Sequence, residues 1–134
     1  MIKSLFICLI INICSVSTDK NYCKVFYQNG QLKSEGWVRN NQKTGYWFYY
    51  NSDGVKLEEG HYKNDKKVKW WILYNDNAEI IKKSEFKNNV QNGYSIIYKK
   101  GNPIRGEMFV NGIKTKEWYS LLEFKADNFI SGIQ

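Results

Sequence analysis

A repeat of about 24 residues runs through most of the chain and constrains its fold more than any other feature. The segments that begin at residues 27, 50, 74 and 98 align when they are written under one another. Four columns carry the alignment: Tyr50, Tyr74 and Tyr98; Gly36 and Gly60, continued by Ser84; Asn40, Asn64 and Asn88, continued by Asn111 after a one-residue slip; and Tyr46, Trp70, Tyr94 and Trp118. A chain of 134 residues is long enough for one ordinary domain, so the repeats are expected within a single structural unit.

Each repeat contains two strand-like runs separated by turn signals. The first repeat, for example, has a run of aromatic residues at 46–50 followed by Asn-Ser-Asp-Gly. Turn signals at this spacing are typical of antiparallel sheet, and Asn, Asp and Gly tolerate the positive φ of tight turns. The aromatic content of 16% suits side chains that stand on a narrow sheet. The sequence therefore predicts an all-β fold, an elongated single-layer antiparallel β-meander of about four 24-residue hairpin repeats.

The aromatic run also predicts how the sheet is packed. Because side chains alternate along a strand, residues 46, 48 and 50 are expected on one face, with Trp47 and Tyr49 on the other. Residues 70–74 repeat this arrangement one unit later, so rings are expected to stack from repeat to repeat and supply the burial that a second layer would otherwise give. Gly36 and Gly60 are expected to leave room for a ring from the neighbouring strand.

The first 17 residues have the composition of a secretory signal peptide. Lys3 supplies a positive charge, residues 5–14 form an apolar run, and small residues at 15 and 17 permit cleavage before Thr18. The apolar run is shorter than the roughly 20 residues that span a bilayer, so a transmembrane anchor is the weaker alternative, and a buried first strand is a third interpretation. We therefore expect a secreted, periplasmic or cell-envelope location.

The cysteines depend on that interpretation. Cleavage would remove Cys8 and Cys14 and leave Cys23, so an intramolecular disulfide is not expected in the mature chain. Lipidation of Cys14 would instead anchor the protein to a membrane, although Ile13 stands where a lipoprotein signal prefers a small residue. Cys23 is interpreted as an incidental thiol near the start of a strand.

The repeat unit resembles the bacterial variant of the MORN repeat, whose form is YxNGxLKxEGxYxNGxxxGxWxYY. Residues 27–50, YQNGQLKSEGWVRNNQKTGYWFYY, match this form over its whole length, whereas the second repeat has Lys69 where the family prefers glycine. The third repeat lacks the Glu-Gly pair, and the fourth keeps Asn111, Gly112 and Trp118. The resemblance implies an elongated sheet of hairpins with a role in interaction. Some members of this family are antitoxins of toxin–antitoxin pairs, and other MORN proteins are associated with membranes or scaffolds.

These features divide the chain into four parts. We expect a signal peptide at 1–17, an N-terminal lead-in at 18–25, the MORN-like repeat domain at 26–122 and a C-terminal cap at 123–134. Leu121, Leu122 and Phe124 are expected to continue a strand, with a short terminal element after them folded back on the last repeat. Such an end is needed because the last unit of a repeat array has no neighbour to cover it.

No pattern in the sequence predicts catalysis, a metal site or a cofactor. His61 is expected to be a solvent-facing strand residue rather than a general base. Glu58 and Glu59 are adjacent on a strand and should point to opposite faces, so they do not form a carboxylate pair. Glu59 and its counterpart one repeat earlier are expected to pair across strands with lysines such as Lys33 or Lys56. We therefore expect that the protein is not an enzyme.

The candidate interaction surface combines aromatic and basic side chains, namely Trp37, Trp47, Tyr49, Trp71, Lys66, Lys67 and Lys69. Such a surface could stack single-stranded nucleic acid or carbohydrate, but a signal peptide argues against nucleic acid, and the net charge of +7 is scattered without a run of five cations. An unknown protein partner is favoured. An anionic membrane surface and self-association through edge strands are alternatives, as is the interpretation that these rings only pack the sheet.

The sequence thus predicts a non-enzymatic exported repeat protein that acts as a protein-interaction or scaffold module at the cell envelope. The alternatives are an antitoxin-like protein that binds a partner toxin, which requires an uncleaved N-terminus, and a membrane-surface-associated MORN protein.

Overall fold

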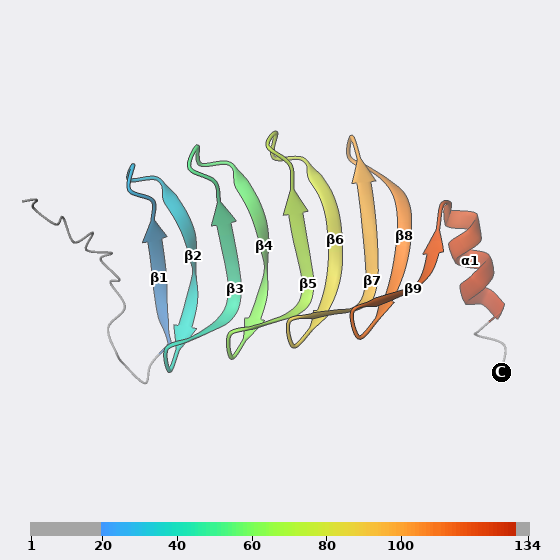
Figure 1. Cartoon of the computed structure of the whole chain (residues 1–134), viewed down its shortest axis with the longest axis horizontal. Coiled ribbons are helices and arrows are strands. Elements are labelled where there is room, and N and C mark those ends of the chain that lie inside the picture. The colour runs from blue at the N-terminus through green and yellow to red at the C-terminus, as the bar shows by residue number, and fades with distance from the viewer. Residues whose placement is uncertain (1–19, 131–134) are drawn as a thin grey trace, which may run out of the picture.

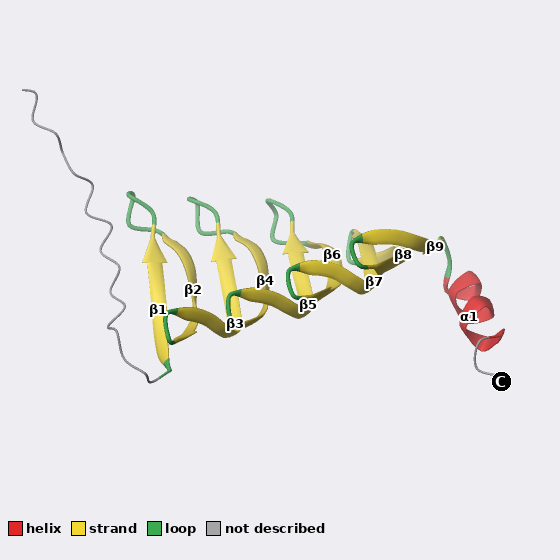
Figure 2. Cartoon of the chain, turned by 60° about the horizontal axis from the view of Figure 1, so that its bottom comes forward, coloured by secondary structure: helices red, strands yellow, loops and turns green. Residues whose placement is uncertain are grey.

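The strands follow one another across a single antiparallel sheet in chain order (Figure 1). The computed structural model describes residues 20–130, so the predicted signal peptide and the last four residues of the predicted cap lie outside the described residues. The nine strands are β1 (Asn21–Phe26), β2 (Leu32–Arg39), β3 (Gln42–Tyr50), β4 (Lys56–Lys63), β5 (Lys66–Tyr74), β6 (Ile80–Lys87), β7 (Val90–Lys99), β8 (Asn102–Val110) and β9 (Ile113–Trp118). The rotated view in Figure 2 shows that they form one curved layer. The predicted all-β single-layer meander is confirmed, and its first strand lies largely in the predicted lead-in.

Two kinds of turn join the strands. The turns between β2 and β3, β4 and β5, β6 and β7, and β8 and β9 have two central residues, both at positive φ as in a type I′ turn; they are Asn40 and Asn41, Asn64 and Asp65, Asn88 and Asn89, and Asn111 and Gly112. The turns at the opposite ends of the strands are longer in the first three repeats. In one of them the Asn51 amide donates to the Val55 carbonyl at 2.8 Å. The Asn, Asp and Gly columns of the repeat therefore mark real turns.

The type I′ turns also bind one repeat to the next. The Asp65 amide donates to the Lys43 carbonyl at 3.0 Å, and the Lys43 amide donates to Asp65 Oδ1 at 2.6 Å. Asn89 and Lys67 repeat this reciprocal pair one unit later, at 3.0 and 2.7 Å. Each turn thus holds the start of the preceding hairpin's second strand, which ties the repeats together along one edge of the sheet.

One face of the sheet, which we call the indole face, carries the rings of Trp47 and Trp71. Trp47 lies opposite Gly36 and Trp71 lies opposite Gly60, and residues directly opposite each other share a face. A Cβ atom built on either glycine would lie 2.4 Å from the indole. The room that the sequence predicts at these two glycines is therefore filled by tryptophan rings.

The other face, which we call the tyrosine face, carries Tyr46, Tyr50 and Tyr74. The Tyr50 hydroxyl donates to Glu35 Oε1 at 3.0 Å, and the Tyr74 hydroxyl donates to Glu59 Oε1 at 2.6 Å. In the first two repeats, therefore, the repeated spacing of tyrosine and glutamate in the sequence corresponds to a hydrogen bond from the tyrosine hydroxyl to the glutamate carboxylate.

The lysine partners of these glutamates differ in part from the prediction. Lys24 on β1, not Lys33, forms the ion pair with Glu35, at 3.7 Å, and the Lys33 ammonium lies over the ring of Tyr27. Lys56 does pair with Glu59, at 2.8 Å, but from the same strand. The prediction of cross-strand pairing was wrong there because the register shift at Leu57 turns Lys56 to the same face as Glu59 within β4.

The predicted strand at residues 121–124 was wrong, because helix α1 (Leu121–Ile130) begins there. Ser120 Oγ accepts a hydrogen bond from the Glu123 amide at 3.1 Å, and Glu123 Oε2 accepts one from the Tyr119 amide at 2.7 Å. Ser120 is thus the N-cap, and the arrangement resembles a capping box in which Glu123 binds the amide of the residue before the N-cap; its Ser-x-x-Glu pattern is visible in the sequence. Phe124 packs the helix against the sheet through its contacts with the rings of Tyr94 and Trp118.

Candidate binding groove at the C-terminal end of the sheet

The residues of the predicted interaction surface do not form one surface. Trp47 and Trp71 are 2% and 4% exposed, so their rings lie inside the packed layer of the indole face and offer no free surface for stacking. Tyr49 stacks beside Trp47 on the same face, with ring centroids 6.2 Å apart. Trp37 lies on the tyrosine face, since it directly follows Gly36 in the strand and successive side chains point to opposite faces.

The lysines of that prediction are divided in the same way. Lys67 lies on the indole face, with its ammonium 3.9 Å from the centre of the Trp71 ring and 2.8 Å from Glu58. Lys66 and Lys69 are exposed on β5 near the type I′ turn. The lysines of β5 therefore have different surroundings, and together with the aromatic residues they do not form one continuous binding surface.

A half-buried cation explains why lysines interleave with aromatic residues on the indole face. The Lys43 ammonium lies about 5 Å from the ring centres of Trp47, Tyr49 and Tyr62 and donates to the Tyr49 hydroxyl at 2.7 Å. Burial lowers the pKa of Lys43, and burial together with the hydrogen bond to Tyr62 raises the pKa of Tyr49. Cation–π contacts of this kind are internal packing.

His61 is half-buried instead of facing solvent as expected. Its ring stands edge-on against Tyr46, with centroids 4.7 Å apart. Burial and the nearby Lys69 ammonium lower the pKa of His61. The imidazole is thus part of the ring packing on the tyrosine face, where the lowered pKa favours its neutral form.

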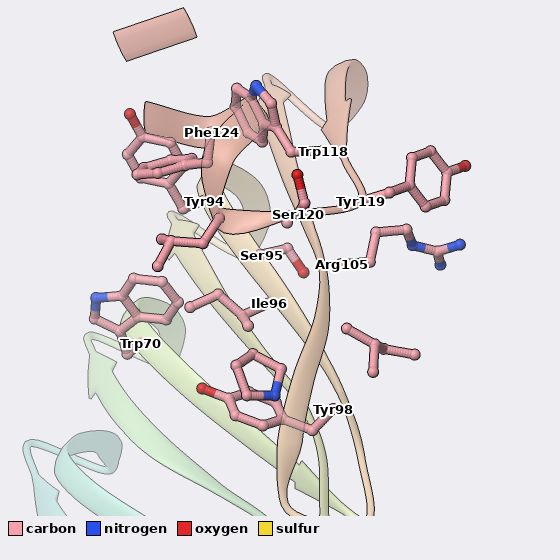
Figure 3. Close-up of a pocket in the computed structure, with 14 residues that line it drawn as sticks. Trp70, Tyr94, Ser95, Ile96, Tyr98, Arg105, Trp118, Tyr119, Ser120 and Phe124 are labelled. Carbon is pink, nitrogen blue, oxygen red and sulfur yellow. The ribbon is translucent and has the colours of Figure 1, made fainter. Parts of the chain in front are cut away.

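An open apolar groove lies on the tyrosine face where the sheet meets α1. Its cavity measures about 430 Å³. The rings and aliphatic side chains that line it include Trp70, Tyr94, Ile96, Tyr98, Trp118 and Phe124. Figure 3 shows Trp70, Ile96 and Tyr98 gathered along one side, while Arg105 and Tyr119 point away. The groove therefore combines side chains from four strands and the helix.

The upper wall of the groove is a cluster of three rings. Phe124 stands edge-on to Trp118 at 5.2 Å and to Tyr94 at 5.8 Å between ring centroids. Trp118 Nε1 donates to Asp127 Oδ2 at 3.0 Å, and Lys116 forms an ion pair with the same oxygen at 2.9 Å. Hydrogen bonds from Lys116 and Trp118 lower the pKa of Asp127. One carboxylate thus fixes both the helix and the indole that form the wall.

Exposed apolar side chains continue from the groove onto the end of the molecule. Leu121 and Leu122 are 66% and 80% exposed, and Tyr119 and Ile104, which also line the groove, are 65% and 47% exposed. Contiguous apolar surface of this kind marks interaction sites. Sequence reasoning missed this site, because the helix that forms one wall was taken for a strand.

Within residues 20–130 the structure contains no group of three or more His, Cys, Asp or Glu side chains that could hold a metal ion. No helix in this part of the chain is both long and apolar enough to cross a membrane.

Comparison with models of known protein families finds none that matches the chain, and comparison with curated proteins likewise finds no match.

Proposed function

We propose that this protein is a non-enzymatic, MORN-like interaction module that acts outside the cytoplasm and binds a partner protein in the groove at its C-terminal end. The open apolar groove between the tyrosine face and α1 carries this proposal. Its volume of about 430 Å³ falls in the range of ligand pockets, roughly 300–1,000 Å³. The rings that line it are the residue types that dominate binding hot spots.

The surroundings of the groove favour a protein partner. Leu121 and Leu122 extend the apolar surface beyond the cavity, so a partner that covers the site must reach past the volume of a single small molecule. The groove is also built on regular strands and a capped helix, which hold it in one shape. Pre-organisation of this kind lowers the ordering cost of association.

A pair of matched variants tests the groove. Leu121→Asp places a charge at its rim, at the start of a helix, where an acidic residue is compatible with the helix dipole. Phe26→Asp makes the same change at a residue 55% exposed on β1, at the far end of the sheet. The immobilised native protein and the Phe26→Asp variant should capture the same protein from an envelope fraction, and Leu121→Asp should lose it. Equal capture by all three would contradict the proposed groove.

The proposed location rests on residues 1–17 and has its own test. The intact mass of the protein recovered from its own cells should correspond to a chain that starts at Thr18, or should carry a lipid on Cys14. A full-length mass in the soluble cytosolic fraction would contradict export and would make an antitoxin-like role with a toxin partner the better interpretation.

A further inference from the structure

A second cavity lies on the indole face, on the side of the sheet opposite the groove. It measures about 140 Å³ and is lined by residues of β5, β6 and β7 with one residue from β4. The side chains that line it include Trp71, Leu73, Lys82, Ser84, Phe86 and Gln91. The corresponding place in each of the two preceding repeats is filled by a side chain of the protein itself.

In the second repeat that place is filled by the indole of Trp71. The ring covers Gly60, stands edge-on to Tyr62 at 5.0 Å and has the Lys67 ammonium 3.9 Å from its centre. Its Nε1 donates to the main-chain carbonyl of His61 at 3.1 Å. The first repeat has the same arrangement, with Trp47 over Gly36.

In the third repeat the chain supplies no indole. Ser95 stands 24 residues after Trp71 and lies opposite Ser84, which takes the place of Gly60. Phe86 and Gln91 correspond in the same way to Tyr62 and Lys67. The two serine hydroxyls lie 2.9 Å apart, and Gln91 Nε2 donates to Ser84 Oγ at 3.3 Å, so a polar floor replaces the ring. The cavity lies above this floor.

We propose that this cavity binds an indole ring supplied from outside the chain, which lies above the two serines and takes the place of the missing tryptophan side chain without reaching the depth that Trp71 has over Gly60. An apolar cavity of about 150 Å³ is large enough to hold benzene, so the volume fits a small aromatic ring. Trp71, Leu73 and Phe86 supply the apolar part of the lining. Lys67, paired with Glu58, and Lys82, near Glu107, supply its charged rim. By the repeat, the carbonyl that accepts the indole N–H is that of Glu85, which corresponds to His61.

Titration of the full chain with two probes tests the proposal and identifies the source of the ring. N-acetyltryptophanamide represents a tryptophan side chain of a partner, and free indole represents a small molecule. Binding is followed by the NMR shifts of the Ser84 and Gln91 amides. A ligand of this size should bind with a Kd of about 1 mM. Binding of both probes points to a side chain, and binding of indole alone points to a small molecule; no shift with either probe overturns the proposal.

Two variants and two controls make the test specific. Ser84→Gly combined with Ser95→Trp should fill the cavity with the chain's own indole and weaken probe binding at least tenfold. Leu73→Asp changes an exposed wall residue without rebuilding the strand and should weaken binding about fivefold if the double variant fails to fold. Leu121→Asp, in the groove on the other face, should leave probe binding unchanged, so failure of this site and failure of the groove are distinguishable. N-acetylleucinamide should bind at least tenfold more weakly than N-acetyltryptophanamide. Unchanged affinity in both cavity variants would overturn the proposal.

Discussion

Hairpins β4–β5 and β8–β9 each set a tryptophan opposite a glycine, but on opposite faces of the sheet. Trp71 lies opposite Gly60 on the indole face, and Trp118 lies opposite Gly106 on the tyrosine face. Both tryptophans are the sixth residue after the second turn residue, at 65 and 112. Equal spacing along the chain therefore does not determine which face a side chain takes.

The size of a β-bulge accounts for the difference. In β5 two residues, 69 and 70, are extra relative to β4, whereas in β9 the extra residue is Thr115 alone. Because side chains alternate along a strand, one residue fewer in the bulge turns the following ring to the other face. The larger bulge contains Lys69 at a φ of +60°, and no residue of β9 has a positive φ. A single residue thus decides whether the ring completes the indole face or forms a wall of the groove.

The largest expected effect compares the two glycines. Gly60→Ala should destabilise the protein by about 3 kcal/mol, because the new Cβ would lie 2.4 Å from a buried indole that must then move. Gly106→Ala should cost about 0.5 kcal/mol or less, apart from any difference in strand propensity between the two residues. The new Cβ would lie 3.3 Å from the Trp118 ring, so the ring needs to move only slightly. Urea unfolding measures both, and equal losses would show that the two Gly–Trp pairs are packed alike.

A double-mutant cycle in the third repeat asks whether the Gly–Trp pair acts as a unit. Ser95→Trp alone should destabilise the fold by about 1–3 kcal/mol, since the indole meets the Ser84 side chain. Ser84→Gly alone should cost about 1 kcal/mol through the lost hydrogen bond and the added chain entropy. The double variant should recover about 2 kcal/mol relative to the sum of the two losses. Simple additivity in urea unfolding would mean that the third repeat cannot accommodate the pair.

The bulge itself supplies a stabilising change. Lys69 has a left-handed φ of +60° where Gly45 occupies the corresponding position of the first repeat at +67°. Lys69→Gly should therefore stabilise the protein by about 1 kcal/mol, because glycine adopts this conformation without steric cost. Lys66→Gly is the matched control on the same strand and should destabilise by about 0.5–1 kcal/mol. If thermal melting shows both variants to be less stable, the bulge at Lys69 is not strained.

These comparisons show what could be predicted from the sequence. The sheet, the turns and the role of Gly36 and Gly60 were predictable because each depends on residues close in sequence or one repeat apart. The face of Trp118 was also predictable, because Trp118 continues the column of Tyr46, Trp70 and Tyr94. Its pairing with Gly106 was not, because that depends on how many residues β9 sets against β8, which spacing along one strand does not reveal. The start of helix α1 was indicated locally by Ser120 and Glu123, but the apolar residues that follow Ser120 were interpreted as a strand.

The candidate sites were less predictable than the fold. Trp47 and Trp71 have the composition of a binding surface, but burial by neighbouring rings is a property of the assembled sheet. The groove required the helix and four strands together. By contrast, the change from tryptophan to Ser95 is visible in the aligned repeats, although the cavity that it leaves depends on walls from three other strands.

The smallest expected effect is the response of the first repeats to alkaline pH. Burial, and then the hydrogen bond to Glu35, raise the pKa of Tyr50 to about 12, above its ordinary value of 10.0. A group whose pKa is higher in the folded state contributes stability below the unfolded pKa and loses it as pH rises toward the folded value. The free energy of unfolding should therefore fall between pH of about 10 and about 12, and Tyr50→Phe should make that fall shallower. Glu35→Gln keeps a hydrogen-bond acceptor without the charge and should lower the Tyr50 pKa, as measured by tyrosinate absorbance. An identical pH dependence in the native protein and in Tyr50→Phe would mean that the Tyr–Glu pair on the tyrosine face contributes nothing to stability in this range.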